Sequence, residues 1–173
     1  MASKGSEYKK TEGGGVTVFE VTPARAPKLW FAIILGGVCA LLGLGIGGGM
    51  MIFLFAIGGF FLWLGTRDVR PKGTRGPMSF KVTRDSIEGG DRTFKKAEIH
   101  RIILKNSITD EELPISFSTT STAGMAGMMF RAQTSMIANT LNVESGGKST
   151  VLAAGMDNTT AYGLLTDVSR ILG

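Results

Sequence analysis

Residues 29–66, LWFAIILGGVCALLGLGIGGGMMIFLFAIGGFFLWLGT, form one uninterrupted stretch without a charged side chain. A helix needs about 20 residues to cross a hydrocarbon core of about 30 Å, so this stretch is nearly twice as long as one span. Four glycines near its middle offer a place to break the helix: Gly45, Gly47, Gly48 and Gly49. The sequence therefore predicts a transmembrane hairpin of two short helices, at about residues 29–44 and 50–65, joined by a tight turn.

Aromatic and basic side chains lie at both outer ends of this hairpin. Trp30 and Trp63 are equally distant from the centre of the turn, so a hairpin places both indole rings at one water–lipid boundary. The residues expected at this membrane interface are Lys28, Trp30, Trp63, Arg67, Arg70, Lys72 and Arg75. The basic residues that follow the hairpin can serve to space the next domain from the membrane, to contact anionic lipid headgroups, or both.

The net charge of +5 is concentrated beside the hairpin. Residues 1–28 carry +2, residues 67–75 carry +3, and residues 77–173 are neutral. Basic residues that flank apolar helices are retained in the cytoplasm, so we expect an integral protein of the cytoplasmic (inner) membrane with both termini cytoplasmic. A nucleic-acid partner is not expected, because its binding requires a basic face on the folded domain.

Small residues recur at a spacing of four within the first half of the apolar stretch. Gly36 and Ala40 are one such pair, and Gly43 and Gly47 are another. This spacing allows helix backbones to approach closely in lipid, so we expect these four residues to be helix-packing positions. They fit packing between the two helices of one hairpin, and they also fit packing between copies of the chain.

Four segments are predicted along the chain. Residues 1–28 form a polar tail in which residues 16–22 alternate like a short strand, residues 29–66 form the hairpin, residues 67–77 form a basic linker, and residues 78–173 form a cytoplasmic domain. Six or seven short strands are expected in this domain, within residues 78–154, followed by an amphipathic helix that Asp157 or Asn158 caps.

The order of these elements resembles that of bacterial pleckstrin-homology-like (PH-like) domains. The resemblance begins at residues 80–88 (FKVTRDSIE), continues after a glycine turn at residues 94–103 (FKKAEIHRII), and extends to the last helix. It implies a small β-barrel whose open end is closed by the carboxy-terminal helix, and a binding or scaffolding module without catalytic activity. Some members bind phosphoinositides through a basic loop between the first two strands. Here that loop contains Arg84 beside Asp85, so this kind of headgroup recognition is in doubt.

The residues required for common enzymatic chemistry are missing from the sequence. His100 is the only histidine and Cys39 the only cysteine, which excludes the usual zinc ligand sets and an internal disulfide. No G-x-S-x-G turn is present, and Gly147-Lys148-Ser149 lacks the first glycine of a phosphate-binding loop. We therefore expect no enzymatic activity, no cofactor, no metal and no small-molecule substrate.

An apolar, methionine-rich stretch lies at residues 124–130 (GMAGMMF). Methionine side chains adapt to irregular surfaces and are common at protein-binding sites. Its side chains proposed for partner contact are Met125, Met128, Met129 and Phe130. A strand of the barrel core is an equally good interpretation of this stretch.

These features together predict a non-enzymatic, membrane-anchored binding or scaffold module, an accessory or structural subunit of a larger membrane assembly. Its expected partners are membrane lipid and either other membrane-complex proteins or further copies of itself. Two alternatives remain open. One is a self-oligomerising effector that disrupts membranes and senses a signal through its β domain. The other is a peripheral module that senses anionic lipid.

Overall fold

The computed structural model describes residues 5–28, 30–46, 48–68, 70, 72–108 and 132–173. The chain forms two units. A helical unit lies within residues 26–69, and a β unit is built from the described residues within 5–25, 70–108 and 132–173. The fold class is therefore mixed, with apolar helices and two antiparallel sheets.

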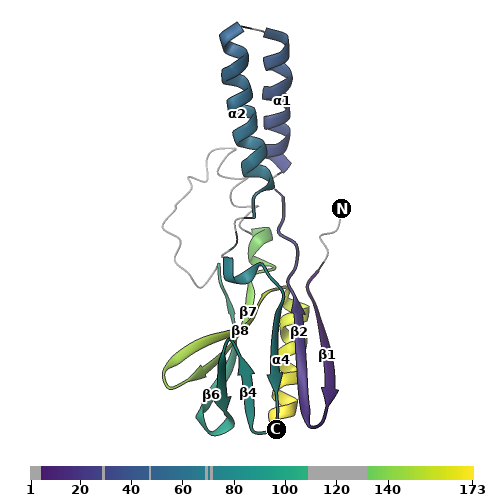
Figure 1. Ribbon diagram of the computed structural model, residues 1–173, viewed down its shortest axis with the longest axis vertical. Coiled ribbons are helices and arrows are strands. Elements are labelled where there is room, and N and C mark those ends of the chain that lie inside the picture. Colours follow the sequence, from purple (N-terminus) through teal and green to yellow (C-terminus); the bar gives the residue numbers. More distant parts are fainter. Residues whose placement is uncertain (1–4, 29, 47, 69, 71, 109–131) are drawn as a thin grey trace. The chain divides into compact units, whose positions relative to one another are not determined.

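The helical unit consists of two antiparallel helices, α1 (Trp30–Ile46) and α2 (Gly48–Thr66), which lie side by side (Figure 1). Among the described residues, α2 alone is long and apolar enough to cross a membrane by itself, and α1 is a shorter apolar helix. Both helices continue further toward the turn than expected: Gly45 and Gly49 are helical, and α2 begins at Gly48, which has a φ of +64°. Glycine costs only about 1 kcal/mol in a helix, and tertiary packing of apolar neighbours can offset this.

The first sheet has five antiparallel strands in the order β1-β2-β3-β4-β5. The strands are β1 (Glu7–Gly13), β2 (Val16–Thr22), β3 (Met78–Val82), β4 (Ser86–Gly89) and β5 (Arg92–Lys95). The prediction that residues 1–15 form part of a polar tail is wrong for β1, which pairs with β2 along its whole length. Its charged side chains remain exposed while the backbone groups along one side pair with β2, so a strand forms at the sheet edge without an apolar sequence.

In the sequence, the two helices lie between two strands that are neighbours in this sheet. β2 and β3 pair antiparallel, and Phe19 lies opposite Phe80 with the two ring centroids 5.2 Å apart. Residues 23–77, between these strands, contain both α1 and α2. The strand expected at residues 16–22 is confirmed, and it belongs to the sheet of the later domain.

The second sheet has three antiparallel strands in the order β6-β7-β8. Its strands are β6 (Ile99–Asn106), β7 (Asn139–Ser145) and β8 (Lys148–Met156), and two short 3-10 turns, η1 (Lys72–Thr74) and η2 (Lys96–Glu98), precede β3 and β6. Within residues 78–154, where only strands were expected, a helical turn at residues 132–135 precedes β7. Residues 109–131 of the same stretch lie outside the described residues.

A carboxy-terminal helix, α4 (Asn158–Leu172), covers the core of the β unit (Figure 1). Asp157 caps its first turn by accepting a hydrogen bond from the Thr160 backbone amide, so the predicted cap and helix are confirmed. The apolar face of α4 buries Leu164 and Val168. These side chains join a core of buried residues from both sheets: Phe19, Val21, Phe80, Val82, Ile87, Leu141, Val143 and Met156.

Candidate functional site

The helical unit exposes an unusually apolar surface. Trp30 is 60% exposed and Trp63 is 53% exposed, and most large apolar side chains between them point outward. Among the described residues, the exposed large hydrophobic side chains outside α1 and α2 are Met136, Val151 and Tyr162. Soluble proteins rarely expose a continuous apolar surface of this extent.

The two helices contact each other at small residues. A Cβ atom added at Gly36 would lie 2.8 Å from the carbonyl oxygen of Gly58, and one added at Gly58 would lie 2.9 Å from the carbonyl oxygen of Gly36. The same position on Gly58 is 3.3 Å from the Ala40 amide nitrogen, and a Cβ at Gly43 would be 3.3 Å from Leu54 Cβ. Gly36, Ala40 and Gly43 therefore face α2 of the same hairpin.

The remaining predicted packing residue, Gly47, lies outside the described residues. Gly58, the residue on α2 that meets Gly36, was not among the predicted packing positions. The sequence does contain a signal for this role. Gly58 and Gly65 are seven residues apart, a spacing that places both on one helix face, and both are buried in the structure.

Two of the expected interface residues interact at the end of α2. The guanidinium carbon of Arg67 lies 4.6 Å from the centre of the Trp63 ring, a cation–π arrangement. Arg67 and Lys28 are both exposed, so their charges are accessible to solvent or to lipid headgroups. Lys72 begins η1.

Arg70 does not have the environment expected for a headgroup contact. It is only 5% exposed, and its Nη1 donates a hydrogen bond of 2.6 Å to the carbonyl oxygen of Ala24. Arg75 in turn donates from Nε to the carbonyl oxygen of Arg70 over 2.7 Å, and its Nη2 contacts the same oxygen. The structure thus corrects the assignment of Arg70 to the membrane interface, because burial within the β unit keeps its charge from lipid.

Arg70 belongs to a cluster that fixes both connections to the helices, which we call the attachment cluster: Pro23, Ala24, Arg70, Thr74 and Gly155. The Ala24 amide donates to the carbonyl oxygen of Gly155 over 2.8 Å. Gly155 has a φ of +74°, and a Cβ there would lie 2.6 Å from both Pro23 Cβ and the Thr74 carbonyl oxygen. The segment that leaves β2 and the segment that returns to β3 are therefore held together against β8.

A second polar cluster fixes the amino terminus to α4. The backbone amide and the hydroxyl of Ser6 both donate to Asp157 Oδ2 over 3.0 Å, and the Asp157 amide donates to Ser6 Oγ. Burial acts to raise the pKa of Asp157, but hydrogen bonds from Thr160 and Ser6 outweigh it and hold the pKa below its ordinary value. The hydroxyl of Tyr8 donates to Asp167 over 2.9 Å, and burial together with this bond raises the pKa of Tyr8.

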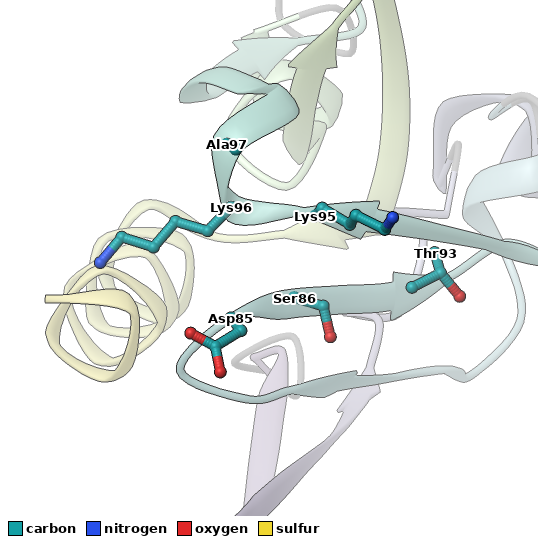
Figure 2. A pocket seen from close by; sticks show the side chains of 6 residues that line it. All are labelled: Asp85, Ser86, Thr93, Lys95, Lys96 and Ala97. Carbon is teal, nitrogen blue, oxygen red and sulfur yellow. The ribbon is translucent and has the colours of Figure 1, made fainter.

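A shallow, open depression of about 630 Å³ lies beside β4, β5 and η2, lined by Asp85, Ser86, Thr93, Lys95, Lys96 and Ala97 (Figure 2). Figure 2 shows Lys95 and Lys96 extending in opposite directions, so their ammonium groups do not converge on one ligand. The Nζ of Lys96 contacts the carbonyl oxygen of Leu172 and lies 3.5 Å from that of Gly173, at the end of α4. Its charge therefore stabilises a helix carboxy terminus.

The remaining predicted sites are only partly within the described residues. Met125, Met128, Met129 and Phe130 lie outside them. His100 is exposed on β6, and the described residues contain no group of three histidine, cysteine, aspartate or glutamate side chains that could hold a metal ion. On β6 and β7, Glu144 pairs with Arg101 at 2.5 Å and with Lys105 at 3.5 Å, so these two basic residues have a local counter-ion.

No protein-family model, no curated protein and no solved structure matches this chain.

Proposed function

We propose that this protein is a non-enzymatic binding or scaffold module, anchored in the cytoplasmic membrane by a hairpin in which both α1 and α2 cross the bilayer. The observation that carries the proposal is the insertion of two exposed apolar helices between the paired strands β2 and β3. The PH-like interpretation of the β unit stays part of the proposal. It is supported by the order of two antiparallel sheets followed by a closing helix.

The pairing of β2 with β3 supports two crossings over one. If α2 alone crossed the membrane, the residues before it and the residues after it would lie on opposite sides. β2 precedes α2 and β3 follows it, yet the two strands are hydrogen-bonded neighbours from Thr17 opposite Val82 to Val21 opposite Met78. The pairing therefore supports an even number of crossings, and the exposed apolar surface of both helices favours two over none.

The position of the positive charge supports a cytoplasmic β unit. Lys28 precedes α1 and Arg67 follows α2, and both are exposed. Residues 40–62, which include the turn, contain no charged side chain. Basic residues at both outer ends of a hairpin keep those ends on the cytoplasmic side, so only the turn would reach the opposite surface.

The binding or scaffold role rests on the surfaces that the chain offers. The depression beside β4 and β5 is open, its two lysine ammonium groups diverge, and that of Lys96 contacts the carboxy terminus of α4. The hairpin and the attachment cluster, in contrast, are built from closely fitted residues such as Gly36, Gly58 and Gly155. The closely packed positions thus lie in the proposed membrane anchor and in its connection to the β unit. This arrangement is suited to holding the β unit, and a partner bound to it, at the membrane.

The topology can be tested by cysteine labelling in membrane vesicles. In a Cys39→Ser background we would introduce Glu12→Cys in β1, Lys148→Cys in β8 and Gly49→Cys beside the turn, three exposed positions. We expect a membrane-impermeant maleimide to label the first two variants from the same side and the third from the other side. Labelling of Glu12→Cys and Lys148→Cys from opposite sides would refute the double crossing.

The scaffold role can be tested by native mass spectrometry of the full-length protein extracted in mild detergent. Other polypeptides that accompany it in a fixed ratio are expected for a subunit of a membrane assembly. A homo-oligomer without other chains would support the self-assembling effector instead. That alternative is favoured by Gly37 and Gly59, which have no atom within 4 Å of an added Cβ and so leave open faces on both helices.

A further inference from the structure

The helices of the hairpin are at the short end of the range that spans a bilayer. α1 has 17 residues and α2 has 19. At about 1.5 Å per residue these helices are about 26 and 29 Å long, whereas the hydrocarbon core of a typical bilayer is about 30 Å thick. Any tilt of the helices shortens their reach across the membrane further.

The positions of the two tryptophans increase the difference between the length of the hairpin and the thickness of the hydrocarbon core. Sixteen residue steps separate Trp30 from the end of α1 at Ile46, and fifteen separate Trp63 from the start of α2 at Gly48. These steps correspond to about 24 Å and about 22 Å of helix. Tryptophan side chains favour the water–lipid boundary, so a hairpin with both indoles at one boundary reaches about 6 to 8 Å less than a full core of about 30 Å.

The turn end of the hairpin nevertheless has to reach water or lipid headgroups. The last four carbonyl groups of a helix and the first four amides of the next have no partner within their own helix. Residues 40–62 contain no side-chain nitrogen or oxygen, so no side chain near the turn can satisfy these groups. Unpaired backbone groups cost several kcal/mol each in hydrocarbon, and the turn cannot stay at that depth.

We infer that the hairpin selects thin bilayers, or draws the two surfaces of a thicker bilayer toward each other around itself. The inference rests on the proposed double crossing and adds the kind of membrane that suits it: a phospholipid bilayer with short acyl chains. Both requirements, indoles at one surface and the turn at the other, are met together only when the local hydrocarbon core is close to the reach of α1 and α2. Each ångström of mismatch costs a fraction of a kcal/mol, so the effect accumulates over the shortfall.

The test uses the full chain with Cys39→Ser and Gly49→Cys, reconstituted into phosphatidylcholine vesicles. The acyl chains are monounsaturated and range in separate preparations from fourteen to twenty-two carbons. A thiol reagent enclosed in the vesicles reports arrival of the turn at the far surface. We expect labelling to be highest in the shortest-chain bilayers and to fall about threefold or more in the longest.

A lengthened hairpin is the matched variant. Four leucine or alanine residues inserted after Leu44 and four before Ile52 add about 6 Å to each helix on the turn side, away from the contact between Gly36 and Gly58. Maximal labelling should move to longer acyl chains in this variant. Equal labelling at every acyl-chain length would overturn the inference but not the proposed anchor. The same conclusion would follow if the turn stayed unlabelled in a protein that resists alkaline extraction. A protein that alkaline extraction releases from every bilayer would overturn the proposed anchor as well.

Discussion

The Nη1 atom of Arg70 donates a hydrogen bond of 2.6 Å to the carbonyl oxygen of Ala24, although α1 and α2 separate these residues in the sequence. Ala24 follows β2, and Arg70 lies just before β3. The bond therefore joins the outgoing and returning connections of the helical insertion within the β unit. Both connections are held at one place on β8, because the Ala24 amide also donates to Gly155.

Replacement of Arg70 by glutamine should loosen these connections. A hydrogen bond from a charged group contributes about 1.5–3 kcal/mol, and glutamine is too short to restore it. We expect amide hydrogen exchange at residues 23–28 to accelerate on the order of tenfold or more. Mass spectrometry of the full chain in detergent micelles measures this rate. Arg84→Gln, at an exposed position, is the control and should leave exchange at residues 23–28 unchanged.

Replacement of Gly155 by alanine should destabilise the β unit through a steric clash. The new Cβ would lie 2.6 Å from Pro23 Cβ and from the Thr74 carbonyl oxygen. Gly147 has the same φ of +74° but no atom within 4 Å of an added Cβ, so Gly147→Ala carries the backbone strain without the clash. We expect the free energy of unfolding to fall by about 1–3 kcal/mol more in Gly155→Ala. Equal losses in urea titrations of the two variants would rule out the clash.

Sequence patterns could predict the elements whose signals are local. The apolar stretch, the strands from β3 onward and the helix capped by Asp157 each carry a periodicity or a capping residue of their own. The predicted ends of α1 and α2 fall short of the observed ends, because glycines near a turn often mark a helix break, whereas a glycine inside a helix costs only about 1 kcal/mol.

Long-range relationships could not be predicted in the same way. β1 has the sequence EYKKTEG, which carries no strand periodicity, and its formation depends on pairing with β2 and on the bond from Tyr8 to Asp167. An arginine next to an apolar helix can contact lipid headgroups or pack within the protein, and only the fold shows that Arg70 is buried. Likewise, a glycine within a strand indicates a close backbone approach in general, but not that Gly155 meets two distant segments.

The cluster around Asp157 should make stability depend on pH in the acid range. The pKa of Asp157 is lowered in the folded state, so the carboxylate contributes stability above the ordinary aspartate pKa of about 3.9. That contribution is lost as the pH falls through the lowered pKa, because the folded protein must then bind the proton that the unfolded chain already carries. Asp157→Asn should therefore lower the free energy of unfolding at pH 7 and have progressively less effect below about pH 4.

Urea titrations at a series of pH values measure this difference between the wild type and Asp157→Asn. Asparagine is also a good helix cap, so the variant separates the charge of the cap from its hydrogen bond to Thr160. Asp85→Asn, at an exposed position, controls for the general loss of a negative charge. A difference between wild type and Asp157→Asn that stays constant from pH 7 to pH 3 would contradict the assigned role of the carboxylate.

Adjacent glycines on α1 allow the helix contact to be tested with a matched pair. Gly36→Ala places a Cβ 2.8 Å from the Gly58 carbonyl oxygen and from Leu62 Cγ, whereas Gly37→Ala meets no atom within 4 Å. The two substitutions gain the same helix propensity, so only the first should separate α1 from α2, at a cost of about 1–3 kcal/mol. Titration with sodium dodecyl sulfate in mixed micelles, followed by circular dichroism, should show a lower midpoint for Gly36→Ala and an unchanged or higher one for Gly37→Ala. The reverse order would mean that the face bearing Gly37 makes the important contact, as expected if copies of the chain pack through it.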